Sequence, residues 1–238
     1  VEEFTLHHKP DVVLNAAAYT AVDAAEQHPE AAFRVNCTGA ENVALAARSI
    51  GARVLYVSTE AVFDGTRSAP VVEDDMCNPL SQYAQSKHAG EGAVLGASEY
   101  NWVLRTSWLY SKKGSTNFPY RLVERLRATS DAVPVVTDLW GQPTPAELLA
   151  RWILEFVFRQ PPGGIFHAAC SGLVSKHDWG VAVARRHGFS SGRISGTLQA
   201  CFSNLAPRPP SVELNCSKIE LILGEKLKSW DLAFREFS

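Results

Sequence analysis

Three short apolar runs, separated by segments with helical spacing, constrain the fold of this chain more than any other feature. The runs lie in "PDVVLNAAA", "RVLYVST" and "YNWVLRTSWLY". Continuous apolar runs of this length are typical of strands buried on both faces. Residues 29–51 carry alanine and valine at helical spacing, with Pro29 in the first turn and Gly51 at the end. The alternation predicts an α/β fold with a doubly wound parallel sheet.

This regular alternation is lost after Tyr110. Helices are expected within 119–130, 146–160 and 175–188, and short strands within 132–138 and 163–170. A long polar loop, 60–81, precedes the helix expected at 82–97. Loops of this length in a compact domain are usually functional. We therefore expect a second, smaller lobe whose segments are interleaved with the end of the main sheet.

Composition narrows the class of protein. The net charge is −2, which does not favour nucleic-acid binding. No apolar run reaches the roughly 18 residues that a membrane span needs. The five cysteines are odd in number and scattered, and the first residues are polar and acidic without the pattern of a signal peptide. These features predict reduced thiols and a cytoplasmic location. His167, Cys170 and His177 match no compact ligand spacing, so no metal site is predicted.

Residues suited to acid–base chemistry follow the strands at the edge where such sheets bind ligands. Thr59 ends the second strand, and Tyr83 and Lys87 lie four positions apart in the next helix. A free phenol has a pKa near 10, and an ammonium one helical turn away favours its ionised form. Such a pair suits proton transfer to a carbonyl that Thr59 would hold while a nicotinamide supplies hydride. The pair alone is a weak signal, because the same spacing also occurs on solvated helix faces.

A Ser/Thr followed by YxxxK on the next helix resembles the short-chain dehydrogenase/reductase superfamily. Six ordered segments together resemble its dTDP-4-dehydrorhamnose reductase family: "PDVVLNAAAYTAVDAAEQHPEAAFRVN", "VSTEAVFDGT", "NPLSQYAQSKHAGE", "LRTSWLYS", "VVTDLWGQPTPAELLA" and "APRPPSVELNCSKIE". The resemblance covers most of the chain. It implies reduction by NADPH or NADH of the C4 keto group of a nucleotide-linked 4-keto-6-deoxy sugar. The favoured reaction is dTDP-4-dehydrorhamnose to dTDP-rhamnose.

The resemblance also implies roles for individual residues. Tyr83 would give a proton to the sugar C4 oxygen, Lys87 would tune Tyr83 and hold the nicotinamide ribose, and Thr59 would bind the carbonyl. Cofactor contacts are implied for Ala16, Ala17, Tyr19, Ser58, Tyr83 and Lys87. Substrate contacts are implied for Thr59, Trp108, Asn117, Thr144 and Arg208, with Trp108 along the sugar and Arg208 at the diphosphate.

The implied fold is Rossmann-like. Residues 1–110 and about 133–165 would form the nucleotide-binding domain, and about 111–132 and 166–238 the substrate-binding lobe. The family opens with a strand and a glycine-rich turn that receives the cofactor pyrophosphate, and none precedes "PDVVLNAAA". We therefore expect this chain to begin inside the family's first domain. A homodimer is a further expectation taken from the family.

Two alternative functions remain open. Glu60 follows Thr59, where dehydratases of the superfamily place acidic helpers, so an epimerase or dehydratase acting on a nucleotide sugar is possible. Ala61 stands where the family often has a tyrosine, which leaves the identity of the sugar open. The second alternative is a non-catalytic regulatory subunit similar to the methionine adenosyltransferase β subunit. Thr59, Tyr83 and Lys87 argue against it, because a binding module has no need of them.

Overall fold

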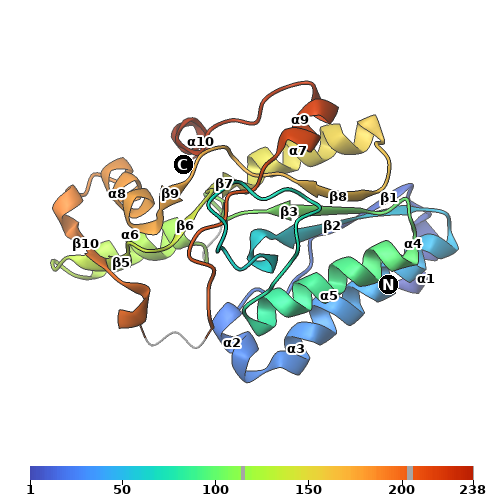
Figure 1. The fold of residues 1–238 in the computed structure, drawn as a ribbon, viewed down its shortest axis with the longest axis horizontal. Helices are drawn as coiled ribbons and strands as arrows, with labels where there is room; N and C mark the ends of the chain where they lie inside the picture. The colour runs from blue at the N-terminus through green and yellow to red at the C-terminus, as the bar shows by residue number, and fades with distance from the viewer. Residues whose placement is uncertain (114–115, 203–205, 238) are drawn as a thin grey trace.

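A parallel sheet forms the centre of the main domain (Figure 1). The computed structural model describes residues 1–113, 116–202 and 206–237. Within these residues the sheet has four strands in the order β1-β2-β3-β8, and every neighbouring pair is parallel. The strands are β1 (Val12–Asn15), β2 (Arg53–Thr59), β3 (Trp102–Thr106) and β8 (Gly164–His167). The predicted α/β fold with a parallel sheet is confirmed.

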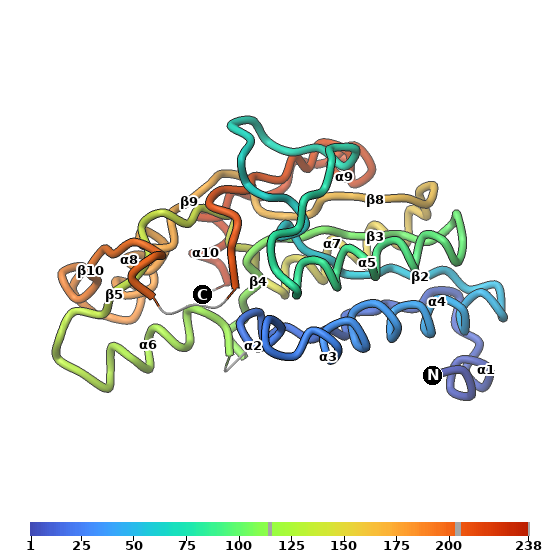
Figure 2. Tube along the Cα trace, turned by 60° about the horizontal axis from the view of Figure 1, so that its bottom comes forward, coloured from blue at the N-terminus to red at the C-terminus, as the bar shows by residue number. Residues whose placement is uncertain are grey.

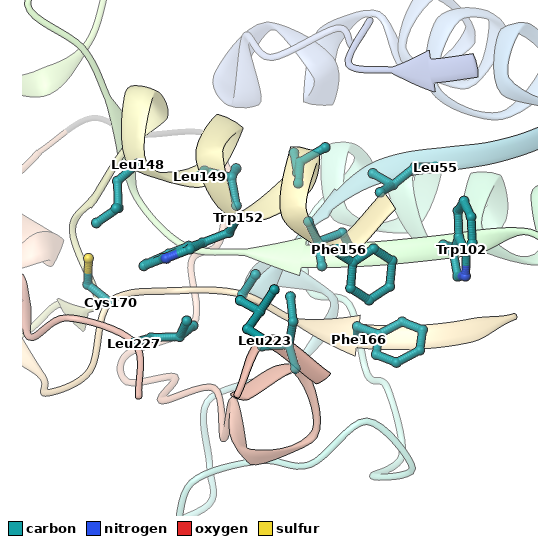
Figure 3. Packing of buried hydrophobic residues seen from close by; sticks show 14 of the residues in the cluster. Leu55, Trp102, Leu148, Leu149, Trp152, Phe156, Phe166, Cys170, Leu223 and Leu227 are labelled. Atoms are coloured by element: carbon teal, nitrogen blue, oxygen red, sulfur yellow. The ribbon is translucent and has the colours of Figure 1, made fainter. Parts of the chain in front are cut away.

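Helices cover both faces of this sheet because successive strand residues point to opposite sides. Val54 and Tyr56 pack with the helices of one face, whereas Leu55 packs with those of the other. The first face holds α4 (Gly39–Ser49) and α5 (Gln82–Ala97). The second face holds α7 (Ala146–Arg159), α9 (Ser217–Leu223) and α10 (Trp230–Phe237). In Figure 3, Phe156 of α7 lies beside the strand residues Leu55 and Phe166 of this second core, and Trp152 lies toward Cys170.

The helix predicted at 29–51 forms without a break, but it changes from an α-helix to a π-helix and back within its length. It comprises α3 (Pro29–Phe33), the π-helical turn η1 (Arg34–Thr38) and α4, and it ends before Gly51 with φ 74°. Local π-turns in helices often occur at functional sites. The turn at η1 places Asn36 beneath the loop that follows β1, as described below. Two shorter helices flank this part, α1 (Glu2–His8) and α2 (Val22–Gln27).

A smaller lobe lies beyond the carboxyl ends of the strands (Figure 2). It contains α6 (Phe118–Ala128), α8 (Lys176–Arg186) and a parallel pair formed by β5 (Val133–Val136) and β10 (Ile194–Thr197). Its own core includes Leu122, Leu126, Val135, Trp179 and Val183. Short pairs connect the lobe with the main domain: β4 (Leu109–Tyr110) with β7 (Thr144–Pro145), and β6 (Trp140–Gly141) with β9 (Val174–Ser175). The remaining turns are η2 (Glu60–Val62), η3 (Ser191–Arg193) and η4 (Gln199–Cys201).

The packing departs from the predicted domain boundaries in two places. Strand β5 was expected in the nucleotide-binding domain, but it pairs with β10 in the lobe. Helix α9 was expected in the lobe, but Ile219 and Leu223 pack in the main-sheet core. Helix α10, also expected in the lobe, contributes Phe237 to the main-sheet core and Phe234 to the lobe core. Local patterns reveal a strand or a helix but not its neighbour, which accounts for both differences. The division into a cofactor domain and a substrate lobe itself stays a prediction. Among the described residues, no helix has the length and apolar character to cross a bilayer.

Candidate active site

The strand register brings the ends of β1, β2 and β3 to one edge of the sheet. Thr59 pairs with Thr106, so β2 and β3 end at the same height, whereas β1 ends at Asn15, opposite Tyr56 and before the end of β2. Thr59 begins η2, where its hydroxyl accepts a hydrogen bond from the Ala61 amide at 3.2 Å. The same hydroxyl donates to a Glu60 carboxylate oxygen at 2.9 Å. A Thr hydroxyl can redirect its single proton by rotation, so this group can donate to another acceptor in the cleft.

Tyr83 lies in the first turn of α5, beside Thr59 and Glu60. The helix begins at Ser81, whose hydroxyl accepts a hydrogen bond from the Ala84 amide at 3.2 Å. Burial raises the pKa of the Tyr83 phenol above its ordinary value, the Glu60 charge raises that pKa further, and the hydrogen bond with Thr59 opposes both. The phenol therefore carries its proton at neutral pH. As a whole residue Tyr83 is only partly buried.

Lys87 is buried one turn further along α5. Its ammonium donates to the Val57 carbonyl oxygen at 2.7 Å and lies 3.7 Å from the centre of the Tyr56 ring. Burial lowers the pKa of Lys87 to about 7, while Glu91 acts in the opposite direction. The sequence predicted that this ammonium tunes Tyr83, but its contacts here are with β2. Its direct effect on Tyr83 stays a prediction.

The loop after β1 is held in place by Asn36. The Tyr19 amide donates to the Asn36 side-chain oxygen at 2.8 Å, and the Asn36 amide group donates back to the Tyr19 carbonyl at 3.2 Å. The same amide group donates to the Ser86 hydroxyl at 2.9 Å, in the helix that carries Tyr83 and Lys87. Asn36 thus connects two walls of the site. Sequence reasoning missed this residue, although a polar side chain within an alanine-rich helix is a signal that could have identified it.

The exposed edge at this loop suits a flat ligand. Ala16 and Ala17 are exposed, and the Ala17 amide donates to Asn15 at 3.2 Å. Ser58 differs, because its hydroxyl is buried and donates to Glu91 at 2.5 Å. The cofactor contacts expected for Ala16, Ala17, Tyr19 and Ser58 stay predictions.

A cleft of about 600 Å³ opens on the lobe, lined by residues of α6, β5 and α8 together with Trp108 and Arg208. Trp108 forms part of its wall and stacks on Trp179, with ring centres 5.7 Å apart. The backbone of Trp108 has φ 38°, a strained value for a large side chain and one that is concentrated at functional sites. The cleft is basic, because four of its lining residues carry positive side chains: Arg121, Arg125, Lys176 and Arg208.

Arg208 lies in the loop that precedes Ser211 and lines this cleft. Its side chain is held by an ion pair with Asp23. Its guanidinium donates to both Asp23 carboxylate oxygens, at 3.0 and 2.9 Å. Asp23 lies in the first turn of α2, so this ion pair joins the loop after β1 to the rim of the cleft. The arrangement agrees with a position beside a substrate anion, although the contact expected with a diphosphate stays a prediction.

Two other residues expected at the substrate have different surroundings. Thr144 is fully buried, where its hydroxyl donates to the Gln142 carbonyl at 3.0 Å and accepts from the Cys170 amide at 3.1 Å. Asn117 begins α6, accepts from the Tyr120 amide at 3.1 Å and donates to the Ser111 carbonyl at 2.7 Å. Both side chains support the backbone of the lobe. Their substrate contacts stay untested, and we do not include them in the proposed site.

Lys176 is a second residue that sequence reasoning missed. It is the first residue of α8 and lines the cleft beside Trp108. Burial lowers its pKa to about 7, while the Glu60 charge opposes this and Arg208 reinforces it. Burial raises the pKa of Glu60, with Thr59, Lys176 and Ser107 acting in the opposite direction. A chain of interacting groups therefore runs from Lys176 through Glu60 to Thr59 and Tyr83.

A cluster of possible metal ligands lies behind the site. Cys77, His88 and Glu91 each offer one ligand atom, and these three atoms lie within 4.8 Å of one another. The Arg105 guanidinium donates to both Glu91 oxygens, at 3.0 and 2.7 Å, and to the Cys77 sulfur at 3.2 Å. Burial opposes ionisation of Glu91, but hydrogen bonds from His88, Arg105 and Ser58 lower its pKa to about 2. The carboxylate already has a cation beside it, so the cluster is explained as a buried ion pair.

Comparison with known proteins identifies the family. The family model for the RmlD substrate binding domain matches residues 1–238. A "dTDP-4-dehydrorhamnose reductase" from Sinorhizobium fredii is 36% identical over 95% of this chain and 79% of the relative. The chain belongs to the dTDP-4-dehydrorhamnose reductase family. The Bacillus subtilis "Spore coat polysaccharide biosynthesis protein SpsK" is another relative, 34% identical over 97% of the chain and 80% of that protein.

Solved structures of the family share the fold. A dTDP-4-dehydrorhamnose reductase from Clostridium acetobutylicum superposes with a TM-score of 0.93 at 33% identity, covering 99% of this chain and 82% of that one. The Bacillus anthracis reductase, solved in complex with NADP, also gives 0.93, at 28% identity and with 99% and 83% covered. The predicted family, its enzyme class of NAD(P)-dependent oxidoreductases and its nicotinamide cofactor are confirmed by these relatives.

Proposed function

We propose that this protein reduces the C4 keto group of a nucleotide-linked 4-keto-6-deoxy sugar, with dTDP-4-dehydrorhamnose as substrate and dTDP-rhamnose as product. NADPH or NADH supplies the hydride when bound. The observation that carries the proposal is the position of Tyr83 and Thr59 together at the carboxyl edge of β2. Thr59 pairs with Thr106, and Trp108, two residues further along the chain, lines the basic and aromatic cleft. Carbonyl reduction needs a proton donor and a hydrogen-bond donor at one oxygen, and Tyr83 and Thr59 offer both.

The residues of this chain have separable tasks. Thr59 turns its hydroxyl from Glu60 to the C4 oxygen and orients the carbonyl. Tyr83 transfers its phenolic proton to that oxygen as negative charge develops on it. The resulting phenolate is stabilised by the Lys87 ammonium one helical turn away. Trp108 provides an apolar surface for the sugar, and Arg208 pairs with the diphosphate through its planar guanidinium.

The residues present fit a nicotinamide cofactor at the exposed loop that follows β1. Ala16 and Ala17 leave an open surface without large side chains beside Asn15, where a ring can approach the backbone. In this proposal the Lys87 ammonium, which donates to the Val57 carbonyl oxygen at 2.7 Å, also donates to a ribose hydroxyl. Ligands of parallel α/β sheets bind at this edge.

The proposal is tested by incubating the protein with NADPH and dTDP-4-dehydrorhamnose. A reductase consumes one NADPH for each dTDP-rhamnose formed, and both can be quantified by absorbance and chromatography. An epimerase or dehydratase would convert the sugar without net oxidation of NADPH, because it regenerates its cofactor. Sugar conversion without NADPH consumption would therefore replace the proposed function with that alternative.

A further inference from the structure

Lys176 occupies an unusual position for a charged side chain. Its ammonium lies 4.1 Å from the centre of the Trp108 ring, 4.2 Å from that of Phe118 and 4.7 Å from that of Trp179. Aromatic faces attract a cation, and a desolvated site strengthens this attraction. The three rings hold the ammonium at a fixed place on the wall of the cleft.

The hydrogen-bonding capacity of this ammonium is unused within the described part of the chain. A lysine ammonium has three N–H donors, and ring faces do not satisfy them as oxygen atoms do. No oxygen acceptor for the Lys176 ammonium is found among the described residues, whereas its backbone amide donates to the Leu139 carbonyl at 2.8 Å. Partly buried donors without acceptors favour a ligand that brings oxygen atoms to them.

The position of Trp108 locates that acceptor near the reacting carbonyl, because this ring lies 4.1 Å from the ammonium and follows Thr106, the partner of Thr59 in the sheet. The Lys176 charge interacts with the Glu60 carboxylate. That carboxylate accepts a hydrogen bond from the Thr59 hydroxyl, and its charge raises the pKa of the Tyr83 phenol. Arg208, another basic residue of the cleft, is already paired with both oxygens of Asp23. The Glu60 carboxylate and the Lys176 ammonium, whose charges interact, offer an acceptor and a donor to the same hydroxyl group.

We infer that Lys176 is a specificity-determining residue that donates a hydrogen bond to the sugar hydroxyl next to the C4 carbonyl, with Glu60 accepting from the same edge of the sugar. This inference rests on the proposed function. It assigns Lys176 to the hexose and leaves the diphosphate to Arg208. The substrate class is thereby narrowed to keto-hexoses that keep an oxygen on C3.

The inference is tested by calorimetric titration with dTDP-rhamnose and, separately, with dTDP, both in the presence of NADP⁺. Lys176→Met removes the donor and the charge but keeps an unbranched stem for packing on the three rings. A lost hydrogen bond to a charged donor corresponds to a loss of affinity of roughly 10–100-fold. We expect this loss for dTDP-rhamnose and less than about a two-fold change for dTDP. Lys226→Met, at an exposed lysine far from the cleft, is the matched control and keeps both affinities.

Two results would contradict the role inferred for Lys176 while leaving the proposed function intact. Equal losses for dTDP-rhamnose and dTDP would mean that Lys176 binds the diphosphate, and unchanged affinities would leave it only a packing role. A wild-type protein that binds neither ligand and leaves NADPH unoxidised would instead contradict the proposed function itself. Retention of affinity in Lys176→Arg, which keeps a donating cation, would further support the role of the donor.

A second measurement needs no change in the protein, so it remains decisive if Lys176→Met does not fold. The wild-type kcat/KM for the keto-sugar is compared with that for its 3-deoxy analogue. The inference predicts a roughly 10-fold or greater preference for the hydroxylated sugar, expressed mainly in KM. Equal kcat/KM values for the two sugars would contradict it.

Discussion

Single residues set the acid–base properties of this site. Burial holds the Tyr83 phenol in its protonated form, whereas burial lowers the pKa of Lys87 to about 7. The identity of Thr59, Tyr83 and Lys87 could be predicted from their order in the chain. Glu60 was noticed only as a possible dehydratase helper, and Lys176 was not noticed at all, because its importance arises from three rings brought together by folding.

The lowered pKa of Lys87 predicts an alkaline limit to activity. A lysine is charged below its pKa, so the ammonium that stabilises the Tyr83 phenolate is present below about pH 7 and is lost as the pH rises through that value. We expect kcat to fall above about pH 7 in a pH–rate profile. Since burial lowers the pKa of Lys176 to about 7 as well, the same profile is measured for Lys176→Met. Persistence of the alkaline fall in that variant assigns it to Lys87, and its disappearance would contradict this prediction.

Elements position these residues through close contacts that local sequence patterns do not reveal. The alternation of strands and helices was predictable, because each element follows from its own apolar spacing. The π-helical turn that contains Asn36 could not be predicted, because it packs against α5, which is distant in the sequence. At Gly90 of α5, a Cβ atom would lie 2.1 Å from the Asn36 carbonyl oxygen and 2.7 Å from the Tyr56 hydroxyl. Only glycine permits this approach.

Two glycines of α5 provide a matched pair for testing that contact. Gly90→Ala forces the backbone of η1 away from α5, and we expect a loss of about 1–3 kcal/mol in the free energy of unfolding. Gly92→Ala, where a Cβ atom would meet nothing within 4 Å, should gain about 0.5–1 kcal/mol from its better helix propensity. Chemical denaturation measures both. Similar effects at the two positions would show that the close approach at Gly90 is unimportant.

At the scale of the whole molecule, a buried ion pair ties the sheet to α5 below the site. Glu91 of α5 and Arg105 of β3 are each 2% exposed as side chains and are joined by hydrogen bonds of 3.0 and 2.7 Å. The segment 60–81 is held by the same pair, because Arg105 also donates to the Glu73 carbonyl at 3.3 Å. Sequence patterns predicted the sheet but not this pair, because its members are neighbours only across two elements.

Breaking this pair should destabilise the fold strongly. Arg105→Met leaves the Glu91 carboxylate buried without its cation, which costs roughly 3–5 kcal/mol. Arg127→Met, which breaks an exposed pair with Glu124 at 3.0 Å, should change stability by no more than about 0.5 kcal/mol. Urea denaturation distinguishes the two outcomes. A small loss in Arg105→Met would show that Glu91 is stabilised by other groups.

The Glu91–Arg105 pair also predicts how the free energy of unfolding depends on pH. The folded-state pKa of Glu91, about 2, lies below its ordinary value, so its contribution is present above the ordinary carboxyl pKa and is lost as the pH falls from there through about 2. Stability measured by denaturation across this range should decrease steeply in the wild type. In Arg105→Met the decrease should be smaller, because the depressed pKa depends on the guanidinium. An unchanged pH dependence would contradict this assignment.

The most direct test of the proposed reaction is single-turnover reduction of dTDP-4-dehydrorhamnose by NADPH in the wild type, in Tyr83→Phe and in the control Tyr100→Phe. Tyr100 is an exposed tyrosine at the far end of the sheet, and its ring contacts Arg53. If Tyr83 donates the proton, its loss slows the reaction by roughly 10²–10⁴-fold, whereas Tyr100→Phe retains the wild-type rate. A rate in Tyr83→Phe within a few-fold of the wild type would contradict the assigned proton donor.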